Sequence, residues 1–258
     1  MASIIKQHML KVFEKKVRLD LRKFEDYREI SLDMGVVKGA EGSARVKIGN
    51  TEVLAGVKFE VGTPFPDTPD QGGIIVNVEL RPLSSPEFES GPPTIEAIEL
   101  SRVIDRALRE GGALELKKLS IKEGELMWMV VIDIYPINHD GNLFDAASLA
   151  ALAALKDAKF PKLEGNKVNY KEITSKKLEL KNMPLSCTVY NIAGNFIIDP
   201  TYEEEKTADS RLTVGVLENG SISSLQKGGN QGLSNEEINS MIELAIKKSK
   251  ELRKAIPK

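Results

Sequence analysis

The most constraining feature of this 258-residue chain is a nearly uninterrupted apolar run in its middle. Residues 125–135 include Leu126-Met-Trp-Met-Val-Val-Ile132, a stretch without a charged side chain. Such a run has no polar face to turn toward water, so it predicts a central strand covered on both sides. A second apolar segment, 145–158, is rich in alanine and predicts a helix packed closely inside the molecule. The chain therefore has to fold around a buried strand and a buried helix.

Further strands and helices are expected on both sides of this pair. Alternating apolar positions flank Gly49-Asn50 and predict a β-hairpin over 42–61. The other expected elements are a strand at 73–80, helices at about 4–15, 94–109 and 235–253, a hairpin at 187–199 and two strands within 211–225. Ser234 and Glu237 form a capping box at the start of the last helix. Recurring strand-then-helix groups without a linker predict one α/β domain over 1–258, with a short N-terminal helix.

Composition excludes several classes of protein. A net charge of -2, with 41% apolar and 29% charged residues, suits a globular protein and argues against one that coats nucleic acid by global charge. Cys187 is the only cysteine, and with two histidines no zinc cluster, other metal or cofactor is expected. No signal peptide and no run of about 18 apolar residues is present, so a cytoplasmic protein without membrane contact is expected.

Several segments match motifs of a known family. They are Arg18-Leu-Asp-Leu-Arg22, Asp26-Tyr-Arg28, Gly42-Ser-Ala44, Asp67-Thr-Pro-Asp-Gln-Gly-Gly73, Ile75-Val-Asn-Val-Glu-Leu80, Gly91-Pro-Pro93, the run 98–109, and Asp140-Gly141 before Asp145-Ala-Ala-Ser-Leu149. Spread along the chain in family order, they resemble the RNase PH superfamily. The resemblance is closest to the non-catalytic one of the two RNase PH-like subunits that build the archaeal exosome ring. Many active members carry glycine where this chain has Leu21.

This resemblance implies both a fold and a function. The implied fold is α+β, with mixed sheets and packed helices, like domain 2 of ribosomal protein S5. The implied function is that of a structural and RNA-binding subunit in a ring of three heterodimers. A catalytic sister subunit would carry out phosphate-dependent 3′-to-5′ RNA degradation, and RNA-binding cap subunits would sit on the ring.

Three positions that supply the chemistry in active members are substituted here. Ile95-Glu96 stands where the family has an arginine pair that grips RNA phosphates, and Asn142-Leu-Phe144 where polar residues bind the attacking phosphate. Arg211 stands at the place of an aspartate, which reverses the charge. Glu205 and Asp209 nearby are interpreted as part of a solvated face. The resemblance therefore implies no catalytic residue in this chain.

Arg102 and Arg106 lie four residues apart on one face of the predicted helix at 94–109. Arginine forks match phosphate geometry, and in the resembling subunit this helix borders the partner's active site, so both are predicted to bind RNA. The alternative is intrahelical pairing of Glu99 with Arg102 and of Asp105 with Arg109. Arg109 is expected to be a surface ion-pair residue.

Other possibilities remain open from the sequence. Lys47 and Lys58 lie on predicted strand faces and could add RNA affinity, although their spacing does not require it. The chain could also be an active homo-oligomeric RNase PH-type phosphorolytic exoribonuclease that uses substituted residues, or a stand-alone binding module. The ring hypothesis requires a tight partner of the same fold, whereas the module would be a monomer.

Overall fold

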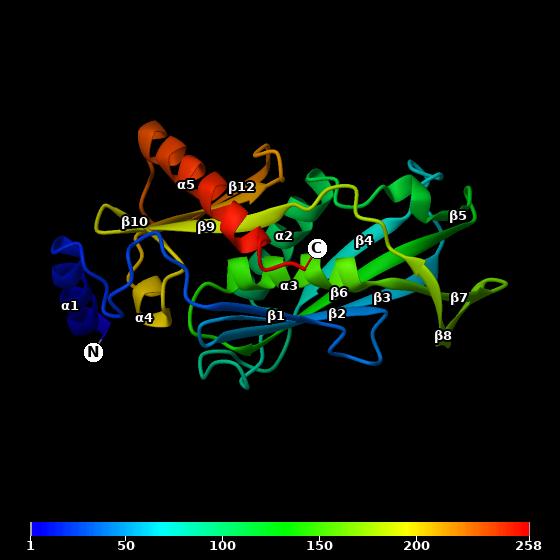
Figure 1. The fold of residues 1–258 in the computed structure, drawn as a ribbon, viewed down its shortest axis with the longest axis horizontal. Helices are drawn as coiled ribbons and strands as arrows, with labels where there is room; N and C mark the ends of the chain where they lie inside the picture. The colour runs from blue at the N-terminus through cyan, green and yellow to red at the C-terminus, as the bar shows by residue number, and fades with distance from the viewer. Residues whose placement is uncertain (1, 258) are drawn as a thin grey trace.

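The computed structural model describes residues 2–257, and for residues 2–6 only the backbone. The helices in Figure 1 are α1 (Ala2–Glu14), α2 (Ile95–Glu110), α3 (Leu143–Asp157), α4 (Tyr202–Glu205) and α5 (Asn235–Arg253), with a 3₁₀-helix η1 (Leu116–Leu119). The strands of the first half are β1 (Ile30–Met34), β2 (Gly42–Ile48), β3 (Thr51–Gly62), β4 (Gly73–Val78), β5 (Ser120–Lys122) and β6 (Leu126–Asn138). The later strands are β7 (Lys159–Glu164), β8 (Lys167–Lys177), β9 (Leu185–Ile192), β10 (Asn195–Ile198), β11 (Ser210–Val216) and β12 (Ile222–Gly229).

The apolar run lies at the centre of the larger sheet, as predicted. The strand order is β1-β2-β3-β6-β4, with β5 also paired to β6. β6 runs antiparallel to β3 and parallel to β4, so its backbone is hydrogen-bonded on both edges. Val130, Ile132 and Ile134 on this strand are inaccessible to solvent. The strand is apolar because water reaches little of it.

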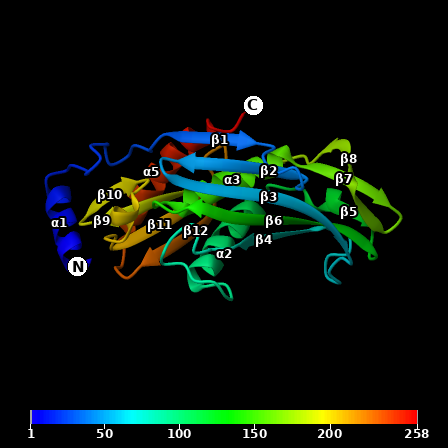
Figure 2. The ribbon, with the colours of Figure 1, turned by 90° about the horizontal axis from the view of Figure 1, so that it is seen from below.

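α3 connects the two main sheets. The second sheet has the order β10-β9-β11-β12 and is antiparallel throughout. α3 contacts β2 and β3 of the first sheet and β9 of the second, while α5 packs on β9 and β11 (Figure 2). Every residue from Leu143 to Leu155 is buried, which explains the alanine-rich composition of this helix.

A single large hydrophobic cluster includes residues of both sheets and of α2, α3 and α5. The mixed α/β fold is confirmed, and its elements begin and end close to the predicted residues. The capping box is also confirmed, because the Ser234 hydroxyl accepts from the Glu237 amide and the Glu237 carboxylate accepts from the Ser234 amide. The single domain over 1–258 stays a prediction, and residues 1 and 258 lie outside the described part of the chain.

Strands β1, β5, β7 and β8 were not predicted, and neither were the short helices η1 and α4. β7 and β8 form a separate two-stranded ribbon at the end of the molecule opposite α1 (Figure 1). Over residues 2–257, no helix combines the length and the apolar composition needed to span a membrane.

Candidate functional site

α2 presents two arginines to solvent beside β12. Its N-terminus is capped by Thr94, whose hydroxyl accepts from the Ala97 amide at 3.3 Å. Residues Val103 and Ile104 face the core, so Arg102 and Arg106 are left on the exposed face. Together with Ile95, Ile98, Leu225 and Gln226 they line a groove of about 420 Å³, here called the α2 groove.

The alternative prediction that Glu99 pairs with Arg102 within the helix is wrong. The Glu99 carboxylate accepts instead from Arg211 Nη2 at 2.6 Å, across 112 residues of sequence. The pairing of Arg109 is confirmed, with 2.7 Å between its Nη2 and Asp105 Oδ1. Neither Arg102 nor Arg106 has a hydrogen bond or ion pair within residues 2–257. Both guanidinium groups are therefore available to an outside anion.

A second hollow lies between the start of α2, the start of α3 and α4, and is here called the acidic pocket. It measures about 250 Å³ and its charged lining residues are Glu87, Glu96, Glu99, Glu205, Lys206 and Arg211. Both cations already have partners, Lys206 with Glu87 and Arg211 with Glu99. Four carboxylates against two cations leave a charge of -2. The pocket repels a phosphate ion.

The acidic pocket brings together the three substituted positions. Glu96, Phe144 and Arg211 all line it, although they are far apart in the sequence. The Arg211 guanidinium lies over the Phe144 ring, 4.3 Å from its centroid. Ile95 lies outside this pocket, on the rim of the α2 groove, and is 85% exposed. The motif alignment therefore picked out residues that line one hollow, and the carboxylates of this hollow favour a cation over an anion.

The interpretation as a solvated face is wrong for Glu205, whereas Asp209 lies at a partly exposed edge of the loop. Glu205 accepts hydrogen bonds from the Tyr190 hydroxyl at 2.7 Å and from the Asn142 amide at 3.0 Å. Asp209 accepts from the Ala193 amide at 3.1 Å. These donors come from other segments of the chain, so the local sequence could not indicate them. Glu205 is retained because it accepts from two partly buried donors that the fold brings to it.

Sequence reasoning missed a buried ion pair behind this loop. Arg18 is fully buried and Glu204 is 1% exposed. Arg18 Nε donates to Glu204 at 3.0 Å, and its other nitrogens donate to the Ile198 and Asp199 carbonyls at 3.1 and 2.8 Å. The Arg18-Leu-Asp-Leu-Arg22 motif was the available signal, and its role here is structural.

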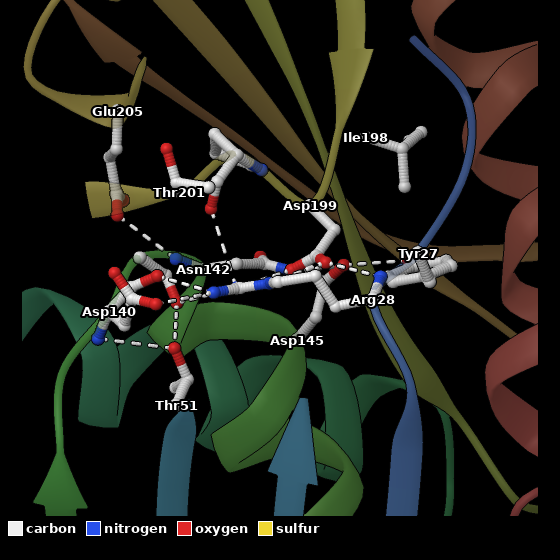
Figure 3. A network of polar contacts seen from close by, with 12 residues as sticks. Tyr27, Arg28, Thr51, Asp140, Asn142, Asp145, Ile198, Asp199, Thr201 and Glu205 are labelled. Atoms are coloured by element: carbon white, nitrogen blue, oxygen red, sulfur yellow. Dashed lines mark hydrogen bonds and ion pairs between the residues drawn. The ribbon is translucent and has the colours of Figure 1, made fainter. Parts of the chain in front are cut away.

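Asp199 is the centre of a polar network next to the acidic pocket (Figure 3). Its carboxylate accepts from Arg28 at 2.7 and 2.9 Å, from Arg22 at 3.0 Å and from Asn142 Nδ2 at 3.0 Å. Arg28 also donates to the Asp140 carbonyl at 2.6 Å. Asn142 is inaccessible to solvent and adopts a left-handed backbone conformation at the start of α3. This network holds Asn142, so the residue after Asp140-Gly141 is not available to a phosphate.

Asp145 extends the network into the core. It accepts from the Tyr27 hydroxyl and the Thr188 amide, both at 2.8 Å, and from Asn142 Nδ2 at 3.3 Å. Burial raises the pKa of Asp145 to about 7. Burial also raises the pKa of Cys187, whose Sγ lies 3.2 Å from the Tyr27 hydroxyl. These groups are closed off from solvent and bind one another.

His139, Lys47 and Lys58 are each engaged by neighbouring side chains. His139 stacks on Phe88 and meets Tyr202 edge to face, and burial lowers its pKa. Lys47 pairs with Glu52 at 3.1 Å, and Lys58 with Glu41 at 2.7 Å. In the part of the chain that the structure describes, no three His, Cys, Asp or Glu side chains are grouped to hold a metal ion.

Comparisons with known proteins agree along the whole chain. Sequence models described as "3' exoribonuclease family" match as domain 1 over residues 26–161 and as domain 2 over residues 182–248. A protein of Methanocella arvoryzae named exosome complex component Rrp42 is 48% identical over 99% of this chain and 96% of its own length. Its Pyrococcus furiosus namesake is 46% identical over 99% of this chain and 93% of its own length.

Solved structures show the same relationship. A chain of the Archaeoglobus fulgidus exosome with RNA bound to the active site has 38% identity and a TM-score of 0.92, with 99% of both chains covered. Rice Rrp46 shares the fold, with a TM-score of 0.70 at 21% identity over 93% of this chain and 97% of its own.

Proposed function

Because this chain belongs to the 3′ exoribonuclease family, the RNase PH family, we propose that it is a structural and RNA-binding subunit of an exosome ring that does not cleave RNA itself. Relatives named as exosome components match it over 99% of its length, and so does an exosome chain of nearly identical fold. They support membership of the ring.

One observation supports the division between binding and chemistry. The two cations of the acidic pocket are already paired with carboxylates, whereas Arg102 and Arg106 on the α2 groove have no partner within residues 2–257. Phosphorolysis brings a phosphate ion against an RNA phosphate, and holding two anions together requires cations whose charge is not yet neutralised. The acidic pocket has none, while the α2 groove has two.

The remaining chemistry is then supplied by a partner. In the proposed assembly this chain alternates with a catalytic sister subunit of the same fold in a ring of three heterodimers, closed by two different interfaces. The sister contributes the phosphate pocket and the acid, and Arg102 and Arg106 hold the incoming RNA at the shared interface. RNA-binding cap subunits complete the particle. Such an assembly lets a chain of net charge -2 act on a polyanion.

An activity assay with and without phosphate tests this assignment. The purified chain, given 5′-labelled RNA and inorganic phosphate, is expected to leave the RNA intact. The complex co-purified with its partner is expected to shorten the same RNA only when phosphate is present. Phosphate-dependent shortening by the isolated chain at the rate of the complex would establish the homo-oligomeric enzyme instead. A stable monomer that captures no partner of its own fold would indicate a stand-alone module.

A further inference from the structure

The β7–β8 ribbon carries a concentration of positive charge unlike the rest of the chain. Residues 159–177 hold six lysines and two glutamates, a charge of +4, in a chain of net charge -2. The remaining residues therefore sum to -6. All six lysines are exposed, namely Lys159, Lys162, Lys167, Lys171, Lys176 and Lys177. The ribbon is a local basic surface on an otherwise acidic protein.

Most of this charge is not neutralised inside the protein. Lys162 contacts both glutamates of the ribbon, Glu172 at 2.7 Å and Glu164 at 3.3 Å. The other five lysines have no carboxylate partner within residues 2–257. Lys159 and Lys177 are directly opposite each other in the strand register, and like charges in that position destabilise a strand pair. An external anion would relieve this repulsion.

Aromatic and apolar surface lies beside these cations. Tyr170 on β8 is 50% exposed, and Lys58 Nζ lies 4.6 Å from its ring centroid. At the base of the ribbon, between β8 and η1, is a hollow of about 320 Å³ lined by Leu119, Phe160 and Leu178 with Lys176 and Lys177.

The hollow has a small positive charge. Its two carboxylates, Glu115 and Glu179, both pair with Lys118, so two glutamates face three lysines. Cations next to an exposed ring and an apolar hollow are a combination that suits single-stranded nucleic acid, because its phosphates and its bases both find partners.

We propose that the β7–β8 ribbon and the hollow at its base bind single-stranded RNA. The lysines hold the phosphates, while Tyr170 and the hollow receive bases. The choice of RNA over DNA rests on the proposed function. The basic surface itself is observed independently of that function. The ribbon lies apart from α2 in both views of the molecule, so this contact is separate from the α2 groove (Figures 1 and 2).

Two charge-matched variants of the full chain test the lysines. The ribbon variant carries Lys159→Ala, Lys171→Ala, Lys176→Ala and Lys177→Ala. The control variant changes four exposed lysines that have carboxylate partners elsewhere, namely Lys47, Lys117, Lys122 and Lys247, also to alanine. Both variants lose four positive charges and keep Arg102 and Arg106. The probe is a fluorescent oligoadenylate of about 20 nucleotides, longer than a typical single-strand site.

Fluorescence anisotropy over a range of salt concentrations gives the outcome. The ribbon variant should bind RNA at least about tenfold more weakly at low salt. The slope of log K against log salt should fall by about 3, since each lost phosphate contact removes about 0.7. The control variant should stay within about twofold of the original chain. Equal affinities and slopes for the two variants would overturn the proposal.

Tyr170 separates RNA from an acidic protein segment. Tyr170→Ala should weaken RNA binding about fivefold or more without changing the salt slope, because stacking carries no charge, and Tyr170→Phe should retain the affinity. The same variants are tested with an oligoglutamate peptide. If the ribbon lysines are needed to bind the peptide but not to bind RNA, the ligand of the ribbon is an acidic protein segment and the assignment to RNA is overturned. These binding assays use the isolated chain. A negative result in them therefore does not affect the test of ring assembly and activity, and a negative result in that test does not affect the binding assays.

Discussion

The arginines near the N-terminus and those of α2 have opposite surroundings. Arg18 is fully buried against Glu204 and two carbonyls, and Arg28 lies between Asp199 and Asp140. Arg102 and Arg106 are exposed and have no partner in the described chain. The first group fastens distant segments together, whereas the second is free to bind a ligand. An arginine's role therefore follows from whether the fold already neutralises its charge.

Arg211 shows that position in a pocket is not sufficient. It lies in the acidic pocket, yet its guanidinium is paired with the Glu99 carboxylate and packs over the Phe144 ring. Because its charge is already neutralised by a carboxylate, Arg211 resembles Arg18 and Arg28 and differs from Arg102 and Arg106.

The largest expected effect tests the structural half of this comparison. Arg18→Ala should lower the free energy of unfolding by about 3 to 5 kcal/mol, because Glu204 would remain buried without a counterion. Urea denaturation measures this loss. Arg102→Ala is the matched control and should change stability by less than about 0.5 kcal/mol. Similar losses for both variants would break the comparison.

The second prediction concerns a buried carboxyl that is neutralised by a proton instead of a cation. The pKa of Asp145 is about 7 in the folded protein, against 3.8 for an unperturbed aspartate. The folded state thus retains a proton that the unfolded chain releases near pH 4. This contribution to stability is complete below about pH 4, is lost as the pH rises through about 7, and then levels off.

Asp145→Asn removes that dependence on pH. Between about pH 5 and about pH 8 the original protein should lose up to about 3 kcal/mol more stability than the variant. Comparing urea unfolding of the two proteins cancels other groups such as His139, whose lowered pKa acts in the opposite direction. A stability difference that stays constant over this range would contradict the prediction.

The ligand-binding half of the comparison predicts an effect on RNA. Changing Arg102 and Arg106 to alanine in the assembled complex should weaken RNA binding about tenfold, or about 1.4 kcal/mol, and reduce the salt slope by about 1.5. Ring assembly, followed by size-exclusion chromatography, should be unchanged. Arg45→Ala with Arg81→Ala is the control, because both arginines are exposed and paired, with Asp33 and Glu79. Unchanged RNA affinity in the α2 variant would remove its arginines from the RNA site.

The smallest expected effect lies in the loop that carries Arg18. Leu21 is 83% exposed and has a φ of 64°, a left-handed conformation that costs about 1 to 2 kcal/mol for a residue with a side chain. Glycine removes this strain but adds about 0.4 to 1 kcal/mol of unfolded-chain entropy, so Leu21→Gly should stabilise by about 0.5 to 1 kcal/mol. Leu19→Gly, at an exposed neighbour outside the left-handed region, should destabilise instead. Thermal unfolding that moves both variants in the same direction would contradict the strain argument.

Local patterns predicted the parts of the fold that depend on local burial. The periodicity of α2 was enough to place Arg102 and Arg106 on its exposed face, and the apolar run was enough to place β6 in the centre. The partner of Glu99 could not be predicted in this way. Its i,i+3 neighbour Arg102 was the local choice, but tertiary packing brings Arg211 to it from 112 residues away.

The β7–β8 ribbon was missed for a different reason. Its strands contain many lysines, and the strand register shifts near Pro161, so the apolar alternation that marks a strand is interrupted. A usable signal was nevertheless present. Gly165-Asn166 separates the two strands, and Gly165 has the positive φ, 60°, that a tight hairpin turn requires.

The buried pair of Arg18 and Glu204 also has a consequence for the order in which the protein is made. Residue 204 leaves the ribosome 186 residues after residue 18, an interval of about 10 to 40 s at ordinary rates of synthesis. Ile198 and Asp199, the other long-range partners of Arg18, emerge almost as late. Throughout that interval Arg18 stays hydrated, and the first sheet has no partner for this N-terminal arginine. The N-terminal segment therefore reaches its final place only after α4 has been synthesised, late in translation.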